Sequence, residues 1–179
     1  MARPTLDFDW VTPSLAVGGR FAPSDASRLV REHAIRHVVD LRLEERDDER
    51  VLRRHGIELL HLPTEDVCAI DVAAIEVGVA WVNARLDRRR RVLVHCEHGI
   101  GRSALLALCV LVSRGEPPLD ALRRAKEARR VVSPSPDQLS AFARYCGALR
   151  ARTGAPWHVP AFDALASIAY RHLLELQER

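Results

Sequence analysis

A cysteine and an arginine at the two ends of one short loop are the residues of this sequence best suited to chemistry. The stretch is Val-Leu-Val-His-Cys-Glu-His-Gly-Ile-Gly-Arg-Ser, with Cys96 and Arg102 on either side of five residues. Gly99 and Gly101 allow backbone conformations closed to other residues, so successive amides can point inward around an anion. A helix beginning at Arg102 would add the positive charge of its N-terminus. The expected phosphate-binding residues are Glu97, His98, Gly99, Ile100, Gly101 and Arg102.

Cys96 lies at the base of this predicted cradle. The amide dipoles, the helix end and Arg102 all favour the thiolate over the thiol, so we expect a nucleophilic sulfur at neutral pH. Arg102 is placed to bind two phosphoryl oxygens bidentately. Together these groups predict covalent phosphoryl transfer through a phosphocysteine, stabilised by preorganised donors and needing no metal and no cofactor.

Phosphoryl transfer to a cysteine also needs a general acid that protonates the leaving oxygen. The segment 62–71 follows a predicted strand and precedes a predicted helix, so it lies at the same end of a parallel sheet as the cradle. It offers three carboxylates, Glu65, Asp66 and Asp71. Asp71 is well placed to cap the following helix, and Glu65 is expected to face solvent. All three are candidates for the acid.

Alternating strands and helices must position these groups. β-rich runs occupy residues 36–41, 57–62 and 91–95, after an extended segment at 10–21 that breaks at Gly18 and Gly19. Helix-start signals or helical periodicity mark residues 24–33, 72–86, 103–112, 119–130, 133–149 and 162–176. The 103–112 segment is apolar on all sides and is expected to be a buried helix. The pattern predicts an α/β fold, a single domain with a mostly parallel central sheet.

His95, Cys96, the five-residue loop, Arg102 and Ser103 together resemble the active-site signature of the cysteine-dependent protein tyrosine phosphatases. The chain length is similar to that of the small dual-specificity branch of this superfamily. The resemblance implies a twisted sheet flanked by helices, with Cys96 as nucleophile and Arg102 as phosphate clamp. It also implies that His95 holds the loop and the thiolate, and that Ser103 helps the thiolate depart during hydrolysis.

The resemblance extends over roughly residues 8–150. It implies that Asp66, which lies 96 − 66 = 30 residues before the cysteine, is the general acid. Gln138 is similar to the family residue that orients water against the phosphocysteine, although a glutamine is also common at the start of a helix. Asp40-Leu41-Arg42 resembles a supporting motif below the phosphate loop, which makes Arg42 structural.

Length and composition indicate an ordinary globular protein. The 179 residues carry a formal net charge of +3, too small for a dedicated nucleic-acid binder. The longest apolar run, 104–112, is too short to cross a membrane, and the first residues lack the apolar region of a secretory leader. Four cysteines without a Cys-x-x-Cys pair indicate reduced thiols, so the expected compartment is the cytoplasm. We expect a phosphatase catalytic domain at 1–150 and a C-terminal helical extension at 151–179 packed on it.

The expected reaction is hydrolysis of phosphotyrosine, with phosphoserine and phosphothreonine as further substrates, in a phosphorylated protein or a small phosphomonoester. Inositol, nucleotide or sugar phosphates are alternative substrates, and a catalytically silent phosphate-binding module is an alternative class. Sulfurtransferases and arsenate reductases also hold a cysteine in an anion-binding loop, but they need no such proton donor. Glu97 would repel highly phosphorylated inositides, unless it turns inward to brace the loop.

Two further features lie outside this chemistry. The run Arg88–Arg91 precedes the third predicted strand at the end opposite the cradle. It is expected to be a solvated turn, with a docking patch for acidic partners or membrane lipid as the alternative. Cys68, beside Asp66, is either a passive thiol or a partner that traps oxidised Cys96 as a disulfide.

Overall fold

Five strands form one central sheet in the computed structural model, which describes residues 5–171. The strands are β1 (Phe8–Thr12), β2 (Leu15–Gly18), β3 (Ile35–Arg42), β4 (Glu58–Thr64) and β5 (Arg91–His95). Their order across the sheet is β1-β2-β5-β3-β4. β1 pairs antiparallel with β2, and the other three pairings are parallel. The predicted α/β fold with a mostly parallel sheet is confirmed.

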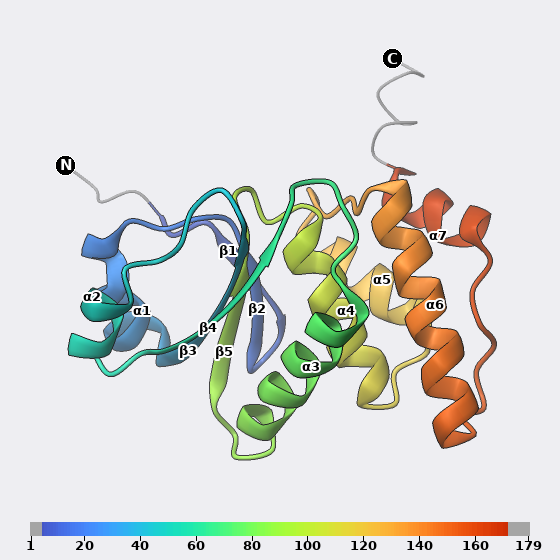
Figure 1. The fold of residues 1–179 in the computed structure, drawn as a ribbon, viewed down its shortest axis with the longest axis horizontal. Helices are drawn as coiled ribbons and strands as arrows, with labels where there is room; N and C mark the ends of the chain where they lie inside the picture. Colours follow the sequence, from blue (N-terminus) through green and yellow to red (C-terminus); the bar gives the residue numbers. More distant parts are fainter. Residues whose placement is uncertain (1–4, 172–179) are drawn as a thin grey trace.

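Helices cover both faces of this sheet (Figure 1). They are α1 (Ala26–His33), which follows the short 3-10 turn η1 (Pro23–Asp25), α2 (Glu49–Arg54), α3 (Val72–Leu86), α4 (Arg102–Ser113), α5 (Pro118–Ala128), α6 (Pro136–Thr153) and α7 (Phe162–Ala169). α1 and α2 lie on one face, where Leu29 and Leu52 form a small core with strand residues such as Val38. The other five helices lie on the opposite face over the larger core.

α4 is the centre of the larger core. Every residue from Arg102 to Val112 is buried, because β5, α3, α5 and α6 surround the helix. Three of its leucine side chains, Leu105, Leu106 and Leu108, are fully enclosed. This confirms the helix that was expected to be buried on all sides. Across residues 5–171, no helix has both the length and the apolar character needed to pass through a membrane.

The parallel strands define two opposite edges of the molecule. Asp40 of β3 lies beside His95 of β5 in the register, so the carboxyl ends of these strands meet at one edge. The connections that leave β4 and β5 lie at this edge, the upper one in Figure 1. The turn between α3 and β5 lies at the lower edge, where the amino ends of the strands meet. The loops that follow β4 and β5, which carry Asp66 and Cys96, are therefore neighbours.

The structure adds detail to the predictions in three places. The extended segment at 10–21 is the β1–β2 hairpin, whose turn is closed by Thr12 Oγ1, which accepts from the amides of Ser14 (3.3 Å) and Leu15 (3.0 Å). The short helix α2 was not predicted, since it buries only Leu52. The helix expected at 162–176 includes α7, while Leu173 and Leu176 lie outside the described residues.

Candidate active site

The predicted phosphate loop connects β5 to α4 at the carboxyl edge of the sheet. Cys96 follows β5 directly and is 3% exposed. Its amide donates a hydrogen bond to the carbonyl of Gly18 at the end of β2 (3.3 Å). Its Sγ lies 3.3 Å from the hydroxyl of Ser103 in the first turn of α4. The thiol therefore lies at the bottom of the loop with a hydroxyl group beside it.

The carbonyl groups of the loop all point outward. Glu97 O accepts from the Arg20 amide (3.0 Å), His98 O and Gly99 O from the Arg129 guanidinium (both 2.9 Å), Ile100 O from the Ser133 amide (3.0 Å) and Gly101 O from the Leu105 amide (2.8 Å). Because the C=O and N–H of one planar trans peptide point in opposite directions, the amides of residues 98–102 turn inward. These amides have no hydrogen-bond acceptor within the described part of the chain. The result is a nest of donors around Cys96.

Gly99 is required by both the shape and the space of this loop. Its φ is +66°, a left-handed conformation that disfavours residues with a Cβ. A Cβ at this position would also lie 2.4 Å from the carbonyl carbon of Gly18. The close approach between the loop and the end of β2 therefore depends on the missing side chain.

Arg102 is 1% exposed and its guanidinium is held by a carboxylate that the sequence did not suggest. Both terminal nitrogens donate to Glu44 (2.7 Å each), and Nη1 also donates to the carbonyl of Thr64 (2.8 Å). The hydrogen bonds from Arg102 lower the pKa of Glu44 to about 2. Nε of Arg102 is buried and has no partner among residues 5–171. One donor of the guanidinium thus remains for a ligand.

His95 is anchored by a buried ionic network beneath the loop. Its Nε2 lies 2.8 Å from Asp47 Oδ2, and its Nδ1 lies 3.3 Å from the carbonyl of Cys96. Arg42 bonds to Asp47 (2.7 Å) and to both oxygens of Asp40 (3.0 Å each). Burial opposes ionisation of Asp40, but the hydrogen bonds from Arg42 outweigh it and lower the pKa of this carboxyl. The supporting role expected for Arg42 agrees with these contacts.

The network also contains three residues of the types that bind metal ions. Donor atoms of Asp40, Asp47 and His95 lie within 4.8 Å of one another. The guanidinium of Arg42 already bonds to both carboxylates, so the protein itself supplies the positive charge that balances them. The cluster does not fit a metal site.

Arg129 braces the outer side of the phosphate loop. It is 6% exposed and, besides the two loop carbonyls, it binds Asp7 (2.8 Å) and Asp9 (2.9 Å) at the start of the chain. The sequence alone indicates no role for Arg129, Glu44 or Asp47. The acidic stretch that directly follows the buried strand β3 is a signal that could have pointed to Glu44 and Asp47.

Asp66 lies in the loop between β4 and α3, beside Arg102. Its Oδ1 is 3.2 Å from Arg102 Nη2, and its side chain is 61% exposed. Asp71 instead caps α3, where its Oδ1 accepts from the amides of Ala73 (2.9 Å) and Ala74 (3.3 Å). Glu65 is exposed to solvent. Asp66 is the carboxylate of these three that contacts Arg102 in the described structure.

The loop at 65–71, which carries Asp66 and which we call the acid loop, is hydrogen-bonded to the beginning of α6. The carbonyl of Val67 accepts from Ser135 Oγ (2.6 Å), and the carbonyl of Cys68 accepts from Gln138 Nε2 (3.0 Å). The amide of Ala69 donates to Asp137 (3.1 Å). Val67 has a φ of +57°, an unfavourable conformation for a β-branched residue, and these bonds hold it there. The backbone directly after Asp66 is thereby held against the beginning of α6.

Gln138 forms the wall between the two loops. Its Oε1 accepts from the Ser135 amide (2.9 Å) in a capping box, and its side chain is buried. A Cβ at Gly101 would lie 2.4 Å from Oε1, so the amide group packs directly on the phosphate loop. The structure therefore brings Gln138 to the site through both its capping and its contact with Gly101.

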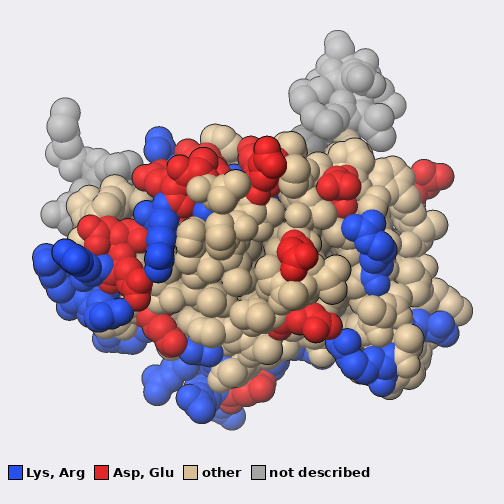
Figure 2. Space-filling model, viewed as in Figure 1, with Lys and Arg blue, Asp and Glu red and all other residues tan. Residues whose placement is uncertain are grey.

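A hollow of about 160 Å³ opens above the cysteine. It is lined by Asp66, Val67, Cys96, His98, Ile100, Gly101, Ser133, Ser135 and Gln138. Glu97 turns away from it toward Arg20 (3.2 Å) and Arg42 (3.7 Å), which favours the bracing role over repulsion at the mouth. Acidic side chains nevertheless gather along this upper edge of the molecule (Figure 2).

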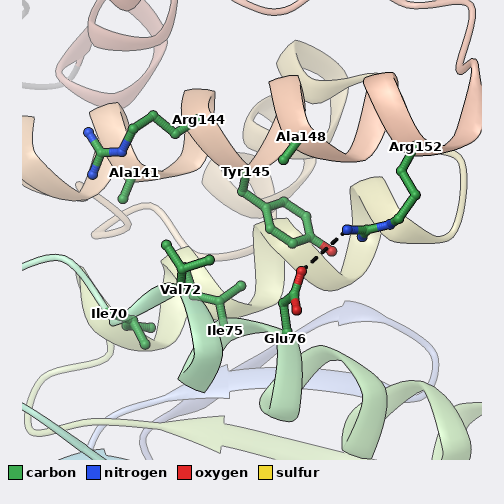
Figure 3. Close-up of a pocket in the computed structure, with 9 residues that line it drawn as sticks. All are labelled: Ile70, Val72, Ile75, Glu76, Ala141, Arg144, Tyr145, Ala148 and Arg152. Atoms are coloured by element: carbon green, nitrogen blue, oxygen red, sulfur yellow. Dashed lines mark hydrogen bonds and ion pairs between the residues drawn. The ribbon is translucent and has the colours of Figure 1, made fainter.

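A separate apolar cavity of about 200 Å³ lies between α3 and α6, behind the acid loop (Figure 3). Ile70, Ile75 and Tyr145 form much of its lining. Glu76 and Arg152 close one end with an ion pair of 3.3 Å. Burial raises the pKa of Tyr145, so its hydroxyl stays protonated. The cavity holds no nucleophile and is not the site of the chemistry described above.

Comparisons of sequence agree with this arrangement. A family model described as "Polymorphic toxin system, DSP-PTPase phosphatase" matches residues 16–116, more than half of the chain. Human dual specificity protein phosphatase 13B is 30% identical over 151 residues, which cover 82% of this chain and 74% of that protein. Human dual specificity protein phosphatase 4 is 34% identical over 76 residues, covering 41% of this chain. That match spans only 19% of the length of the second relative.

Solved structures show the same fold. A mouse putative dual specificity phosphatase complexed with zinc tungstate superposes with a TM-score of 0.76 at 24% identity, covering 88% of this chain and 98% of that one. PTPMT1 in complex with PI(5)P also gives a TM-score of 0.76, at 21% identity, covering 81% and 97%. Taken with the family match and the relative aligned over most of its length, these findings place the chain in the dual-specificity phosphatase family of the cysteine-based protein tyrosine phosphatases.

Proposed function

We propose that this protein hydrolyses phosphomonoesters in two steps, through a phosphocysteine at Cys96. One observation carries the proposal: the inward amides of residues 98–102 and Nε of Arg102 are donors without a protein partner in the described chain, and they surround one sulfur. Buried donors normally have acceptors, and a phosphoryl group supplies several oxygens of the required charge. The family to which the chain belongs supports the same reading.

The first step transfers the phosphoryl group to sulfur. The Cys96 thiolate attacks phosphorus while the bond from phosphorus to the leaving oxygen breaks. Asp66, which lies 3.2 Å from Arg102 at the mouth, gives its proton to that oxygen. The amide nest and Arg102 neutralise the charge that develops on the equatorial oxygens. Glu44 binds both terminal nitrogens of the Arg102 guanidinium and so keeps it in place, which leaves Nε of Arg102 to donate to phosphate.

The second step hydrolyses the phosphocysteine. Asp66, now ionised, takes a proton from water as the water oxygen attacks phosphorus and the bond from phosphorus to sulfur breaks. Ser103 Oγ lies 3.3 Å from the sulfur and donates to the departing thiolate. Gln138, packed against Gly101, orients the water with its amide. His95 holds the backbone of Cys96 and so keeps the sulfur at the centre of the nest.

The mouth favours esters with a single phosphate on an apolar or aromatic group. Val67 and Ile100 line the hollow and are exposed to an approaching substrate (65% and 37%). The residues that line the hollow include no lysine or arginine. The loops that follow β3 and β4 carry the exposed Glu44, Glu65 and Asp66. Additional phosphates would meet repulsion there. Phosphotyrosine is the preferred substrate, with phosphoserine and phosphothreonine peptides as slower ones.

The C-terminal residues 151–179 form an extension of a catalytic unit at 1–150 in this proposal. Two contacts, one to the last residue of α7 and one from Tyr170 just after it, support it. Lys126 Nζ donates to the carbonyls of Val132 (2.6 Å) and Ala169 (2.7 Å), and the Tyr170 hydroxyl donates to the carbonyl of Pro134 (2.7 Å). Both contacts steady the segment that carries Ser133 and Ser135, which line the hollow. The extension thereby supports one wall of the site.

The decisive experiment combines Cys96→Ser with rapid acid quenching of turnover on a labelled phosphotyrosine peptide. The wild type accumulates a covalent phosphoenzyme, whereas Cys96→Ser forms none and loses roughly 10⁴-fold or more in kcat. Asp66→Asn slows turnover by about 10²-fold to 10⁴-fold. Cys68→Ser is the matched control, because it makes the same substitution in a thiol that forms no hydrogen bond in the described structure. Equal turnover by wild type and Cys96→Ser would falsify the mechanism.

The same assay on other substrates distinguishes a phosphatase of phosphotyrosine from a phosphatase of inositol phosphates and from a catalytically silent phosphate-binding module. The preferred order is phosphotyrosine peptide, then phosphoserine peptide, then soluble inositol phosphates. Faster turnover of inositol phosphates would assign the site to that class. Tight vanadate binding without turnover of any ester would identify a silent phosphate-binding module instead.

A further inference from the structure

The edge of the sheet opposite the phosphate loop carries a second group of arginines. They come from three places in the chain: the start of β3, the end of α3 and the α3–β5 turn. The strand register places Ile35 beside Arg91 and His37 beside Glu58, so these segments begin at one level. Basic side chains gather along this lower edge in Figure 2. The fold thus adds Arg36 and Arg85 to the run Arg88–Arg91.

These side chains surround a hollow rather than a flat surface. A groove of about 420 Å³ is lined by Arg36, His37, Glu58, Arg85, Arg88 and Arg90. A smaller hollow of about 200 Å³ adjoins it and is lined by Arg89 and Arg91 together with Arg36, His37 and Arg90. The larger groove alone exceeds the hollow of about 160 Å³ above Cys96. Its size is that of a site for a small molecule.

Most of the positive charge in this groove is not compensated by carboxylates. Glu58 is already paired with Arg85 (2.6 Å), and Asp87 is paired with Arg114 (2.8 Å). Arg88 and Arg90 have no hydrogen bond or ion pair from their side chains within residues 5–171. Arg36 contacts only the carbonyl of His55 (3.4 Å) there. The groove therefore holds a local excess of charge in a chain whose formal net charge is +3.

The backbone that presents these arginines is ordered by its own hydrogen bonds. The amides of Arg88, Arg89 and Arg90 donate to the carbonyls of Arg85 (3.1 Å), Leu86 (2.8 Å) and Arg85 (2.9 Å). Arg89 has a φ of +56°, the left-handed conformation that closes this turn. The floor is equally fixed, since the Arg85 guanidinium lies 3.8 Å from the ring centre of Trp81 and the His37 ring meets the same indole edge-on. The backbone and the floor of the groove are therefore ordered before a ligand binds, which lowers the part of the entropy cost that comes from ordering the chain.

We propose that this groove, which we call the basic groove (Arg36, Arg85, Arg88 and Arg90), binds a small anion that carries two or more phosphate groups. Guanidinium groups bind phosphate oxygens bidentately, and several of them converging on one hollow match a ligand with several such groups. The acidic mouth above Cys96 disfavours the same ligand. The concave shape and the position opposite the phosphate loop argue against a membrane surface, because a molecule docked there would turn its phosphate loop away from the lipid.

Inorganic triphosphate is the probe for this site. Calorimetric titration at low ionic strength compares three full-length proteins: wild type, Arg88→Gln/Arg90→Gln, and Arg123→Gln/Arg124→Gln. The control removes the same charge from exposed arginines of α5 that pair with Asp120 and Glu116. All three proteins have the same phosphate loop. Any triphosphate that binds there contributes equally to each titration and does not affect the difference in affinity between them. Thermal melting verifies that each variant is folded.

We expect the basic-groove variant to bind one equivalent of triphosphate roughly tenfold or more weakly than wild type, with unchanged activity on the phosphotyrosine peptide. The control binds as wild type does. The variant Arg88→Lys/Arg90→Lys keeps the positive charge but loses the bidentate hydrogen bonding of guanidinium. Its affinity for triphosphate should therefore lie between those of the basic-groove variant and the control. The proposal is overturned if the basic-groove variant binds like wild type or if the control loses as much affinity. It is also overturned if hexaglutamate or phosphatidylserine vesicles, rather than triphosphate, are retained through Arg88 and Arg90.

The groove and the phosphate loop share no residue, so the two proposals are tested separately. Loss of triphosphate binding in the basic-groove variant supports the groove even if Cys96→Ser retains full turnover. Conversely, a phosphoenzyme at Cys96 says nothing about Arg88 and Arg90.

Discussion

The two ends of the parallel strands both present arginines, and they do so in opposite ways. At the carboxyl ends Arg42, Arg102 and Arg129 are buried, and each binds at least one carboxylate within 3.0 Å. At the amino ends Arg88 and Arg90 are exposed and have no carboxylate partner in the described chain. The buried set fixes the geometry around the proposed phosphate site. The exposed set leaves its charge available in a wider groove.

The contrast shows what burial requires of a guanidinium. Removing a charge from water costs several kcal/mol unless opposite charges and hydrogen bonds replace the lost hydration. The phosphate-loop end meets this cost with Glu44, Asp47 and Asp7, and each of these acids also orients the arginine that it binds. Exposed arginines keep their hydration, so they need no such partners and gain little fixed geometry in return. Substitutions at the two ends should therefore have very different effects.

The largest difference is expected between Arg102→Lys and Arg88→Lys. A lysine at position 102 cannot donate to Glu44 with two nitrogens while offering a further donor to phosphate, so kcat/KM should fall by about 10³-fold. Arg88→Lys should leave kcat/KM unchanged. Steady-state kinetics on a phosphotyrosine peptide measures both. Comparable activity of Arg102→Lys and wild type would show that a point charge alone clamps the phosphate.

Stability should distinguish the two ends next. Asp40 is fully buried, and Asp40→Asn leaves Arg42 with less opposing charge, which should reduce the free energy of unfolding by about 3 kcal/mol. Asp87 pairs with Arg114 at the other end, where its side chain is 66% exposed, and Asp87→Asn should change stability by less than about 1 kcal/mol. Urea unfolding at neutral pH compares them. Equal losses would contradict the difference between buried and exposed ion pairs.

Arg129 tests whether bracing the loop matters for binding phosphate. Arg129→Lys keeps the charge, but one ammonium cannot hold the carbonyls of His98 and Gly99 together with Asp7 and Asp9. We expect kcat/KM to fall by roughly tenfold to 100-fold, and vanadate to bind more weakly by a similar factor, because the amide nest loosens. Arg130→Lys, at the exposed neighbouring position, is the control. Unchanged vanadate affinity in Arg129→Lys would assign Arg129 to stability alone.

The smallest effect is expected in the pH dependence of stability. The pKa of Asp40 is lower in the folded protein than in the unfolded chain, so its contribution is present above the unfolded pKa and is lost as pH falls through the folded pKa. Glu44, with a pKa of about 2 against an ordinary 4.5, acts in the same direction. The stability gap between wild type and Asp40→Asn should therefore narrow below about pH 4. A gap that stays constant down to pH 2.5 would exclude this linkage.

Much of the site is encoded in short segments. The loop from Cys96 to Arg102, its glycines and the buried helix after it lie within one stretch of sequence, and the structure has the predicted strand, loop and helix there. The cap at Asp71 and the helix start at Ser135 and Gln138 are equally local. Backbone dihedral limits, capping and hydrophobic periodicity operate over a few residues, which is why these features were predictable.

The surroundings of the loop required the fold. Glu44 lies 58 residues from Arg102, Asp47 lies 48 from His95, and Asp7 lies 122 from Arg129. No local pattern marks such pairs, because an exposed and a buried ion pair use the same residue types. The turn inside the predicted extended segment and the helix α2 were not predicted, for the related reason that little apolar periodicity distinguishes them.

The sequence by itself determined the proposed nucleophile, the arginine and the glycine turn between them, together with a mostly parallel sheet to carry them. Tertiary structure alone decided which acids hold those cations, where Glu97 points, and that Arg36 and Arg85 join the run Arg88–Arg91 around one groove. Local geometry follows from short-range sterics and hydrogen bonding along the chain. Charge pairing across dozens of residues depends on which strand ends and loops the packed sheet brings together.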